Sequence, residues 1–273
     1  MVEVVKRSGE SEPYSEEKVV RSMNRVGVPE ELQPQVLKHI EARLHEGITT
    51  DEVFSHILEF LKEKDKKSSL RFNLRQALFD LGPTGFPFEQ YIARIFKQEG
   101  YQVRTNLVME GECVTHEIDL LVEKDGKRDI VEAKFHNQTI GKTDVQVILY
   151  TYARFLDVKE KNNITGVWVI TNTKLTTDAI QYARCKGINF LAWNYPDEKN
   201  LQYFIENPKM YPITILHALT TEEKQRLLED RIVLCSEFLS VPRKELEEVY
   251  GINKNRISEA LESARLVSNG AQQ

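Results

Sequence analysis

Apolar residues recur along the first third of the chain with the spacing of amphipathic helices. An alternating stretch over residues 2–12 predicts a β-hairpin. Four helical patterns follow it, over residues 16–27, 30–47, 50–61 and 70–82. Ser15 can cap the first helix, because its hydroxyl accepts from free N–H groups, and Gly27 can end it. Gly82 and Pro83 stop the last helical pattern, so we expect a first, mostly helical domain over residues 1–83.

The middle of the chain mixes helix and strand patterns. Strands are expected over residues 101–107, 117–123, 129–135, 166–171 and 188–192, with helices over 86–100, 143–156 and 176–186. Asp125 and Gly126 form a two-residue turn that joins the second and third strands as a hairpin. This order of elements is typical of an α/β domain with a mixed central sheet, which we place at residues 84–213.

The chain becomes helical again over residues 214–273. Helical patterns occupy residues 220–239, 242–251 and 252–267. Lys254, Asn255 and Arg256 begin the last pattern, which loosely resembles a helix-hairpin-helix element whose backbone amides bind a DNA phosphate. A helical lid or a dimer contact explains the same pattern more simply.

Three residues on neighbouring predicted strands carry the chemistry of the middle domain. Strand alternation directs Asp119 to one face of its strand, and Glu132 and Lys134 to one face of the next. Two carboxylates that converge there can bind Mg²⁺ or Mn²⁺, with the Ala133 carbonyl and water completing the shell. Lys134 can orient, or help to deprotonate, a water that attacks phosphorus. Solvated charges or cross-strand salt bridges are the alternative for each carboxylate taken singly.

With these residues, the chain from Gly85 to Trp193 resembles the PD-(D/E)xK nucleases, and specifically the Mrr-like restriction endonucleases. Asp119 matches the motif aspartate, Glu132 the acidic position and Lys134 the lysine of E-x-K. The resemblance implies a restriction-endonuclease-like fold, metal-dependent DNA cleavage and a catalytic role for these three residues.

The resemblance extends to the flanking helices. Glu89 matches an additional acidic residue of the family, and Gln146 matches a glutamine in a Q-x-x-x-Y setting that Tyr150 completes. Both are therefore candidate catalytic residues. The chain departs from the family where a glycine-rich segment normally precedes the aspartate, because V-T-H-E stands there and leaves His116 and Glu117 as unassigned residues near the site.

Residues 2 to about 82 resemble the ATP-cone, a regulatory nucleotide-binding module. The resemblance rests on V-x-K-R-x-G from Val4 to Gly9, Tyr14, Lys18, the G-I-T-T run from Gly47 and the helix around Phe72. It implies that ATP or dATP binds as an effector. The residues that would contact its base and phosphates are Val5, Lys6, Arg7 and Lys18. The sequence has no G-x-x-x-x-G-K-[ST] loop, which favours binding without hydrolysis.

Charge and composition narrow the partners. The net charge of −5 argues against a protein that coats nucleic acid, so DNA contact must come from a local basic patch. We expect a soluble, cytoplasmic protein with no membrane partner, because the sequence has no apolar stretch long enough to span a bilayer and no signal-peptide pattern. Cys113, Cys185 and Cys235 are expected to be free thiols.

The leading hypothesis is a Mg²⁺-dependent endodeoxyribonuclease of restriction, defence or DNA-processing type, regulated by ATP or dATP. Cutting both strands favours a homodimer or a higher homo-oligomer. One alternative is a non-catalytic, nucleotide-sensing protein that binds DNA or a partner through a nuclease fold. Another is a nuclease whose substrate is RNA or branched DNA.

Overall fold

The structure is a computed structural model that describes residues 2–6, 9–138 and 141–268. It divides the chain into two compact units, residues 1–75 and residues 76–273. None of the helices in the described ranges has the length and apolar character to span a bilayer.

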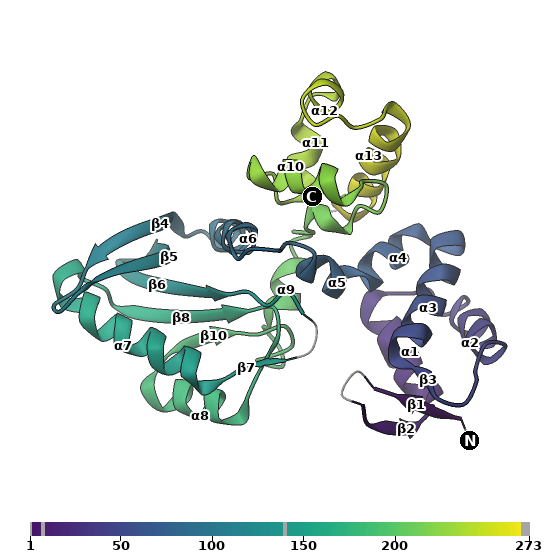
Figure 1. Ribbon diagram of the computed structural model, residues 1–273, viewed down its shortest axis with the longest axis horizontal. Coiled ribbons are helices and arrows are strands. Elements are labelled where there is room, and N and C mark those ends of the chain that lie inside the picture. The colour runs from purple at the N-terminus through teal and green to yellow at the C-terminus, as the bar shows by residue number, and fades with distance from the viewer. Residues whose placement is uncertain (1, 7–8, 139–140, 269–273) are drawn as a thin grey trace. The chain divides into compact units, whose positions relative to one another are not determined.

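The first unit combines a small sheet with a helical bundle (Figure 1). Its elements are β1 (Glu3–Val5), β2 (Ser11–Pro13), α1 (Glu16–Val26), α2 (Gln33–Glu41), β3 (Ile48–Thr49), α3 (Thr50–Lys64) and α4 (Lys66–Phe72), followed by α5 (Leu74–Phe79) at the junction. The sheet has the order β2-β1-β3. Ser15 caps α1 by accepting from the Lys18 N–H, and Gly27 ends it at a φ of 73°. The predicted hairpin and both predicted caps are thus confirmed.

Two expectations for this unit were wrong. The second helix ends at Glu41 rather than at residue 47, because the chain turns there and enters β3, which pairs in parallel with β1. The helix expected over residues 70–82 is instead split at Asn73 into α4 and α5, and α4 already starts at Lys66, because Asp65 accepts from the Ser68 N–H. The core of the unit is apolar and includes Met23, Ile40 and Ile48.

The second unit is built on a five-stranded mixed sheet. Its strands are β4 (Gln102–Glu110), β5 (Thr115–Lys124), β6 (Lys127–Lys134), β8 (Gly166–Thr171) and β10 (Asn189–Leu191), in the order β10-β8-β6-β5-β4. The first three form an antiparallel meander, and β6, β8 and β10 run parallel. The short strands β7 (Lys142–Thr143) and β9 (Lys174–Leu175) pair separately. The predicted α/β class with a mixed sheet is confirmed.

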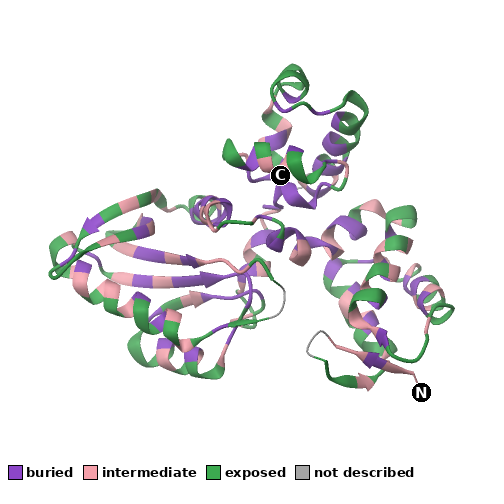
Figure 2. Cartoon of the chain, in the orientation of Figure 1, coloured by how far each residue is buried: buried purple, intermediate pink, exposed green. Residues whose placement is uncertain are grey.

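Helices cover both faces of this sheet (Figure 1). They are α6 (Phe86–Gln98) on one face, and α7 (Val145–Asn162) and α8 (Thr177–Lys186) on the other. Buried residues concentrate on the strands, whereas α7 and α8 expose their outer faces (Figure 2). Because the sheet is covered on both sides, Leu120, Leu121 and Val122 are all buried and the strict alternation expected for β5 is lost.

The C-terminal helices complete the second unit. After α9 (Leu201–Glu206) and a 3₁₀ turn (Ile213–Ile215) come α10 (Thr221–Glu229), α11 (Cys235–Ser240), α12 (Arg243–Glu248) and α13 (Lys254–Ser268). The continuous helix expected over residues 220–239 is wrong, because the backbone turns at Arg231 with a φ of 62°. This region packs on α6: the Tyr91 hydroxyl donates to the Met210 carbonyl at 2.6 Å, and Arg94 pairs with Glu237 at 2.8 Å.

Candidate active site

Asp119 lies where β5 leaves regular pairing with its neighbours. The predicted turn at Asp125 and Gly126 is present, and it sets a β5–β6 register that ends at Leu120 opposite Val131. On the other side, the pairing of β4 with β5 omits Asp119 and the facing Asn106, which has a left-handed φ of 53°. The Asp119 carboxylate instead accepts from the Ala133 N–H at 2.8 Å. This bond fixes the direction of the carboxylate.

Glu132 and Lys134 project from the end of β6 beside Asp119. Both are partly buried, and β6 is held in register by its parallel pairing with β8. The Ala133 N–H points towards Asp119, and the N–H and C=O of one strand residue point to the same side. The Ala133 carbonyl is therefore directed to the same place as the carboxylate, which fits its expected role as a metal ligand.

Arg154 on α7 is a site residue that the sequence interpretation missed. Its guanidinium lies 2.6 Å from the Glu132 carboxylate, and the two side chains are only 13% and 17% exposed. The guanidinium also lies over the Tyr150 ring, 4.7 Å from its centre. Gln146, Tyr150 and Arg154 are spaced four residues apart, so extending the Q-x-x-x-Y pattern by one helical turn would have found the arginine.

Gln146 itself stands at the start of α7. It is exposed, and its backbone N–H donates to the side chain of Asp144, which caps the helix. Gln146 is thus on the same helix face as Arg154 but nearer to its N-terminal end.

Glu89 is brought to the two strand carboxylates by the first turn of α6. The segment before α6 passes close to Phe135, the residue that follows β6. Gly82 permits this approach, because a β-carbon at Gly82 would lie 2.7 Å from the Phe135 ring. Phe88 packs on the same ring with centres 5.6 Å apart. Burial, and then the nearby charges of Asp119 and Glu132, raise the pKa of Glu89 to about 7.

The electrostatics of the cluster favour a bound cation. Burial and the charge of Glu132 raise the pKa of Asp119 to about 6, although the Ala133 N–H, Arg154 and Lys134 partly oppose the shift. Oxygen donors with mutually repelling charges are the ligand set that hard divalent cations prefer. The residues present therefore fit a Mg²⁺ or Mn²⁺ ion held by Asp119, Glu132 and the Ala133 carbonyl.

Two histidines near the site, the unassigned His116 and also His136, make structural contacts. His116 pairs with Asp157 at 2.7 Å, and Asp157 also accepts from the backbone N–H of Cys113 at 2.8 Å. Together these contacts hold the β4–β5 loop against α7. His136 donates its backbone N–H to Asn172, and its imidazole lies 3.0 Å from the Thr143 hydroxyl. These bonds hold the segment that follows Lys134.

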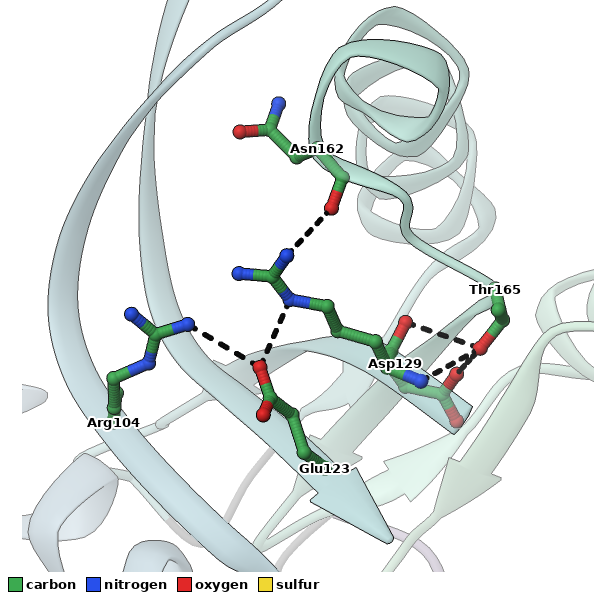
Figure 3. Close-up of polar contacts among 6 residues, drawn as sticks. Arg104, Glu123, Asp129, Asn162 and Thr165 are labelled. Carbon is green, nitrogen blue, oxygen red and sulfur yellow. Dashed lines mark hydrogen bonds and ion pairs between the residues drawn. The ribbon is translucent and has the colours of Figure 1, made fainter. Parts of the chain in front are cut away.

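Basic residues at the opposite end of β6 are engaged within the protein (Figure 3). Glu123 pairs with Arg104 at 3.2 Å and with Arg128 at 2.9 Å, and Arg128 also donates to the Asn162 carbonyl. Thr165 donates to Asp129 at 2.9 Å. These contacts stabilise the hairpin end of the sheet.

The residues expected to contact nucleotide lie on the hairpin and α1 of the first unit. Lys6 and Lys18 both pair with Glu12, at 2.9 and 2.8 Å. Val5 pairs with Ser11 in β2. Arg7 lies outside the described residues.

A cavity of about 200 Å³ opens beside this cluster. Its lining includes Glu12, Tyr14, Lys18, Phe54 and Phe72, so aromatic and charged groups face one space. In the described part of the chain, the Tyr14 hydroxyl is buried and makes no hydrogen bond.

Comparison with known proteins identifies similar domains along the chain. The ATP cone domain model matches residues 2–76, the restriction endonuclease model matches residues 83–194, and the AF1548-like, C-terminal model matches residues 211–268. A protein of Archaeoglobus fulgidus described as uncharacterized is 37% identical over 176 residues, which cover 64% of this chain and 99% of the relative. The crystal structure of a protein of unknown function, AF1548, matches with a TM-score of 0.59 and 34% identity, over 68% of this chain and all of that chain.

Proposed function

The chain belongs to the AF1548-like family of proteins with a restriction-endonuclease domain and carries an ATP cone at its N-terminal end, and on this premise we propose that it is a metal-dependent endodeoxyribonuclease. The observation that carries the proposal is the convergence of Asp119, Glu132 and Glu89 with Lys134 at the end of β6. Three partly buried carboxylates at one point destabilise the protein unless cations or protons neutralise them.

Each residue has a distinct role in the proposed reaction. Asp119, Glu132 and the Ala133 carbonyl hold the cation, which when bound stabilises charge on the scissile phosphate and lowers the pKa of water. The Lys134 ammonium donates to the attacking water and orients it towards phosphorus. Glu89, with a pKa of about 7, accepts a proton at neutral pH and supports the metal ligands. Gln146 lies on the rim, where it contacts the DNA backbone.

Arg154 changes partner during this cycle. Without metal, its guanidinium neutralises Glu132 at 2.6 Å. With a cation held at Glu132, Arg154 would lose this partner and would be free to bind a phosphate oxygen of the substrate, a contact that suits the planar guanidinium. The buried Arg154 Nε, which has no hydrogen-bond partner within the described residues, supports this assignment.

The first unit supplies the regulatory ligand site in this proposal. ATP or dATP binds at the cavity beside Lys18, with its phosphates on Lys6, Arg7 and Lys18 and its base against the apolar lining. Binding there shifts cleavage activity or assembly by favouring one state of the protein. Cleavage of both DNA strands is favoured by two nuclease sites in one assembly, so we expect a homodimer or a higher homo-oligomer.

The test is plasmid cleavage by the purified full chain with Mg²⁺ or Mn²⁺, with and without ATP or dATP. We expect metal-dependent cutting that falls by about 100- to 1000-fold in Lys134→Ala. Glu117→Ala is the matched control, because Glu117 is exposed on the same strand as Asp119. Equal cutting by wild type and Lys134→Ala would refute the catalytic assignment.

The choice of substrate is tested in the same assay. Wild-type protein that binds metal but cuts no plasmid is next given branched DNA and RNA. Cutting of either one would mean that the protein is a nuclease with a substrate other than plain duplex DNA. No cutting of any of them favours a non-catalytic, nucleotide-sensing protein on a nuclease fold.

A further inference from the structure

A second cluster of metal-ligating side chains lies in the first unit, separate from the carboxylates of the nuclease site. His56 and Glu59 are three residues apart on α3, so they project from the same side of the helix, and His39 reaches them from α2. We propose that His39, His56 and Glu59 form a Zn²⁺ site that links α2 to α3.

The distances between the ligand atoms match a tetrahedral zinc site. Glu59 Oε2 lies 3.6 Å from His39 Nε2 and 3.6 Å from His56 Nδ1. One ligand atom from each residue lies within 4.8 Å of the other two. Zinc bonds of about 2.0–2.2 Å at tetrahedral angles separate neighbouring ligands by about 3.4 Å. The two distances to Glu59 Oε2 therefore lie within a few tenths of an ångström of this separation, and the two imidazole nitrogens, within 4.8 Å of each other, need to approach by about 1.4 Å at most.

The state of His39 supports a ligand at this position. Its Nε2 is buried and has no hydrogen-bond partner among the residues that the structure describes. Glu59 Oε2, at 3.6 Å, is just beyond hydrogen-bond distance. Buried polar atoms in folded proteins are almost always satisfied, and an ion is one of the groups that satisfy them. The Phe60 ring packs against the His39 imidazole with centres 5.4 Å apart, which holds the ring in place.

The ligand types select the metal. Two imidazoles and one carboxylate suit Zn²⁺, and three protein ligands leave a fourth position for water. The nuclease site offers oxygen ligands alone and suits Mg²⁺. The two sites therefore differ in metal as well as in location along the chain.

Arg43 lowers the affinity of this site for Zn²⁺, because it forms a competing contact with His39. Its guanidinium lies 3.2 Å from His39 Nδ1 and 3.1 Å from the His39 carbonyl. A guanidinium can only donate, so this contact places the proton of a neutral His39 on Nε2. Zinc needs Nε2 free of a proton, and Arg43 must then release Nδ1. Arg43 is exposed and can move away without breaking the core.

The experiment measures Zn²⁺ binding to the metal-stripped full chain by calorimetry and by metal analysis after dialysis. The Asp119→Ala, Glu132→Ala double variant serves as background, so that the nuclease site does not contribute. We expect one zinc ion per chain, and binding about 100-fold or more weaker after His39→Ala or His56→Ala. His45→Ala is the matched control, since His45 is an exposed histidine of the same unit outside the cluster.

Two further measurements keep the test decisive if a variant folds poorly. Co²⁺ added to the His-intact background should give the visible absorption of a four-coordinate site, and no absorption would overturn the proposal. Arg43→Ala should bind Zn²⁺ a few-fold more tightly, because it no longer competes for His39. Unchanged Zn²⁺ binding in folded His39→Ala and His56→Ala proteins would also refute the site. Neither outcome depends on nuclease activity.

Discussion

The nuclease site and the lysine cluster of the first unit both concentrate charge, but they manage it in opposite ways. At the nuclease site, like charges are buried together, and the pKa values of Asp119 and Glu89 are raised as a result. In the first unit, Lys6 is partly exposed and Lys18 is exposed, and both share Glu12, whose pKa is lowered by hydrogen bonds from Lys18 and Lys6. Among the described residues, the only carboxylate of the first cluster with a close cationic partner is Glu132, which pairs with Arg154, whereas in the second cluster both lysines share one carboxylate.

This difference predicts how each site responds to its ligand. A cation that enters the nuclease site must displace Arg154 from Glu132, but it also relieves the repulsion between Asp119, Glu132 and Glu89, which favours binding. A nucleotide entering the first unit must displace Glu12 from the lysines, which costs part of the attraction it gains. Removal of a single carboxylate should therefore weaken metal binding strongly, whereas the affinity for nucleotide should come from several groups that each contribute a part.

The largest effect is expected from Asp119→Ala. Removing this carboxylate eliminates a metal ligand and the acceptor of the Ala133 N–H, so we expect cleavage to fall by about 1000-fold. Mn²⁺ binding, measured by calorimetry, should be lost as well. Nucleotide binding should not change, and a parallel loss of ATP binding would mean that the variant is misfolded.

The next effect concerns the lysines of the first unit. Lys6→Ala combined with Lys18→Ala should weaken ATP binding by about 10- to 100-fold, since charge-assisted hydrogen bonds to phosphate are lost. Lys38→Ala, an exposed lysine on α2, is the control. Unchanged calorimetric affinity in the double variant would contradict the proposed nucleotide site.

Arg154→Met tests the internal counter-ion of Glu132. Without the guanidinium, the metal no longer competes for the carboxylate, so Mn²⁺ should bind about 10-fold more tightly. Cleavage should nevertheless decrease, because the contact to the substrate phosphate is lost. A variant with weaker metal binding would show that Arg154 positions Glu132 instead of competing with the ion.

The smallest effect is the pH dependence of stability in the metal-free protein. Between the ordinary pKa of 4.5 and a pKa of about 7, folded protein keeps a proton on Glu89 that the unfolded chain has released. Stability should therefore fall as the pH rises through this range, and Glu89→Gln should reduce the fall. Partial exposure limits the difference to roughly 1 kcal/mol or less. Urea denaturation at pH 5 and pH 7.5 measures it, and an identical pH dependence in both proteins would contradict the shift.

Local patterns explain which parts of the molecule the sequence could predict. The hairpin around Gly126 depends on a two-residue turn, so its register, and with it the approach of Asp119 to Glu132, follows from neighbouring residues. Glu89 was found by family resemblance, but its proximity to Asp119 depends on the close approach at Gly82, which is a tertiary contact.

The features that were missed depend on packing between distant segments. Arg154 meets Glu132 only because α7 packs on this face of the sheet, and helix periodicity does not specify that packing. The early end of α2 follows from the pairing of β3 with β1, which no local signal in the helix encodes. Likewise, the helix that begins at Thr221 ends at Glu229, and the chain that follows forms a β-bridge between Leu234 and Pro212, which belong to separate segments.

The anchoring of α6 makes the C-terminal helices part of the nuclease. Glu89 lies on one face of α6, whereas Tyr91 and Arg94 bind Met210 and Glu237 from other faces. A truncated chain that ends before these partners would leave α6 without the contacts of Tyr91 and Arg94. A sequence change in the C-terminal helices can therefore reach the candidate active site through α6, although those helices contribute no residue to the cluster of carboxylates.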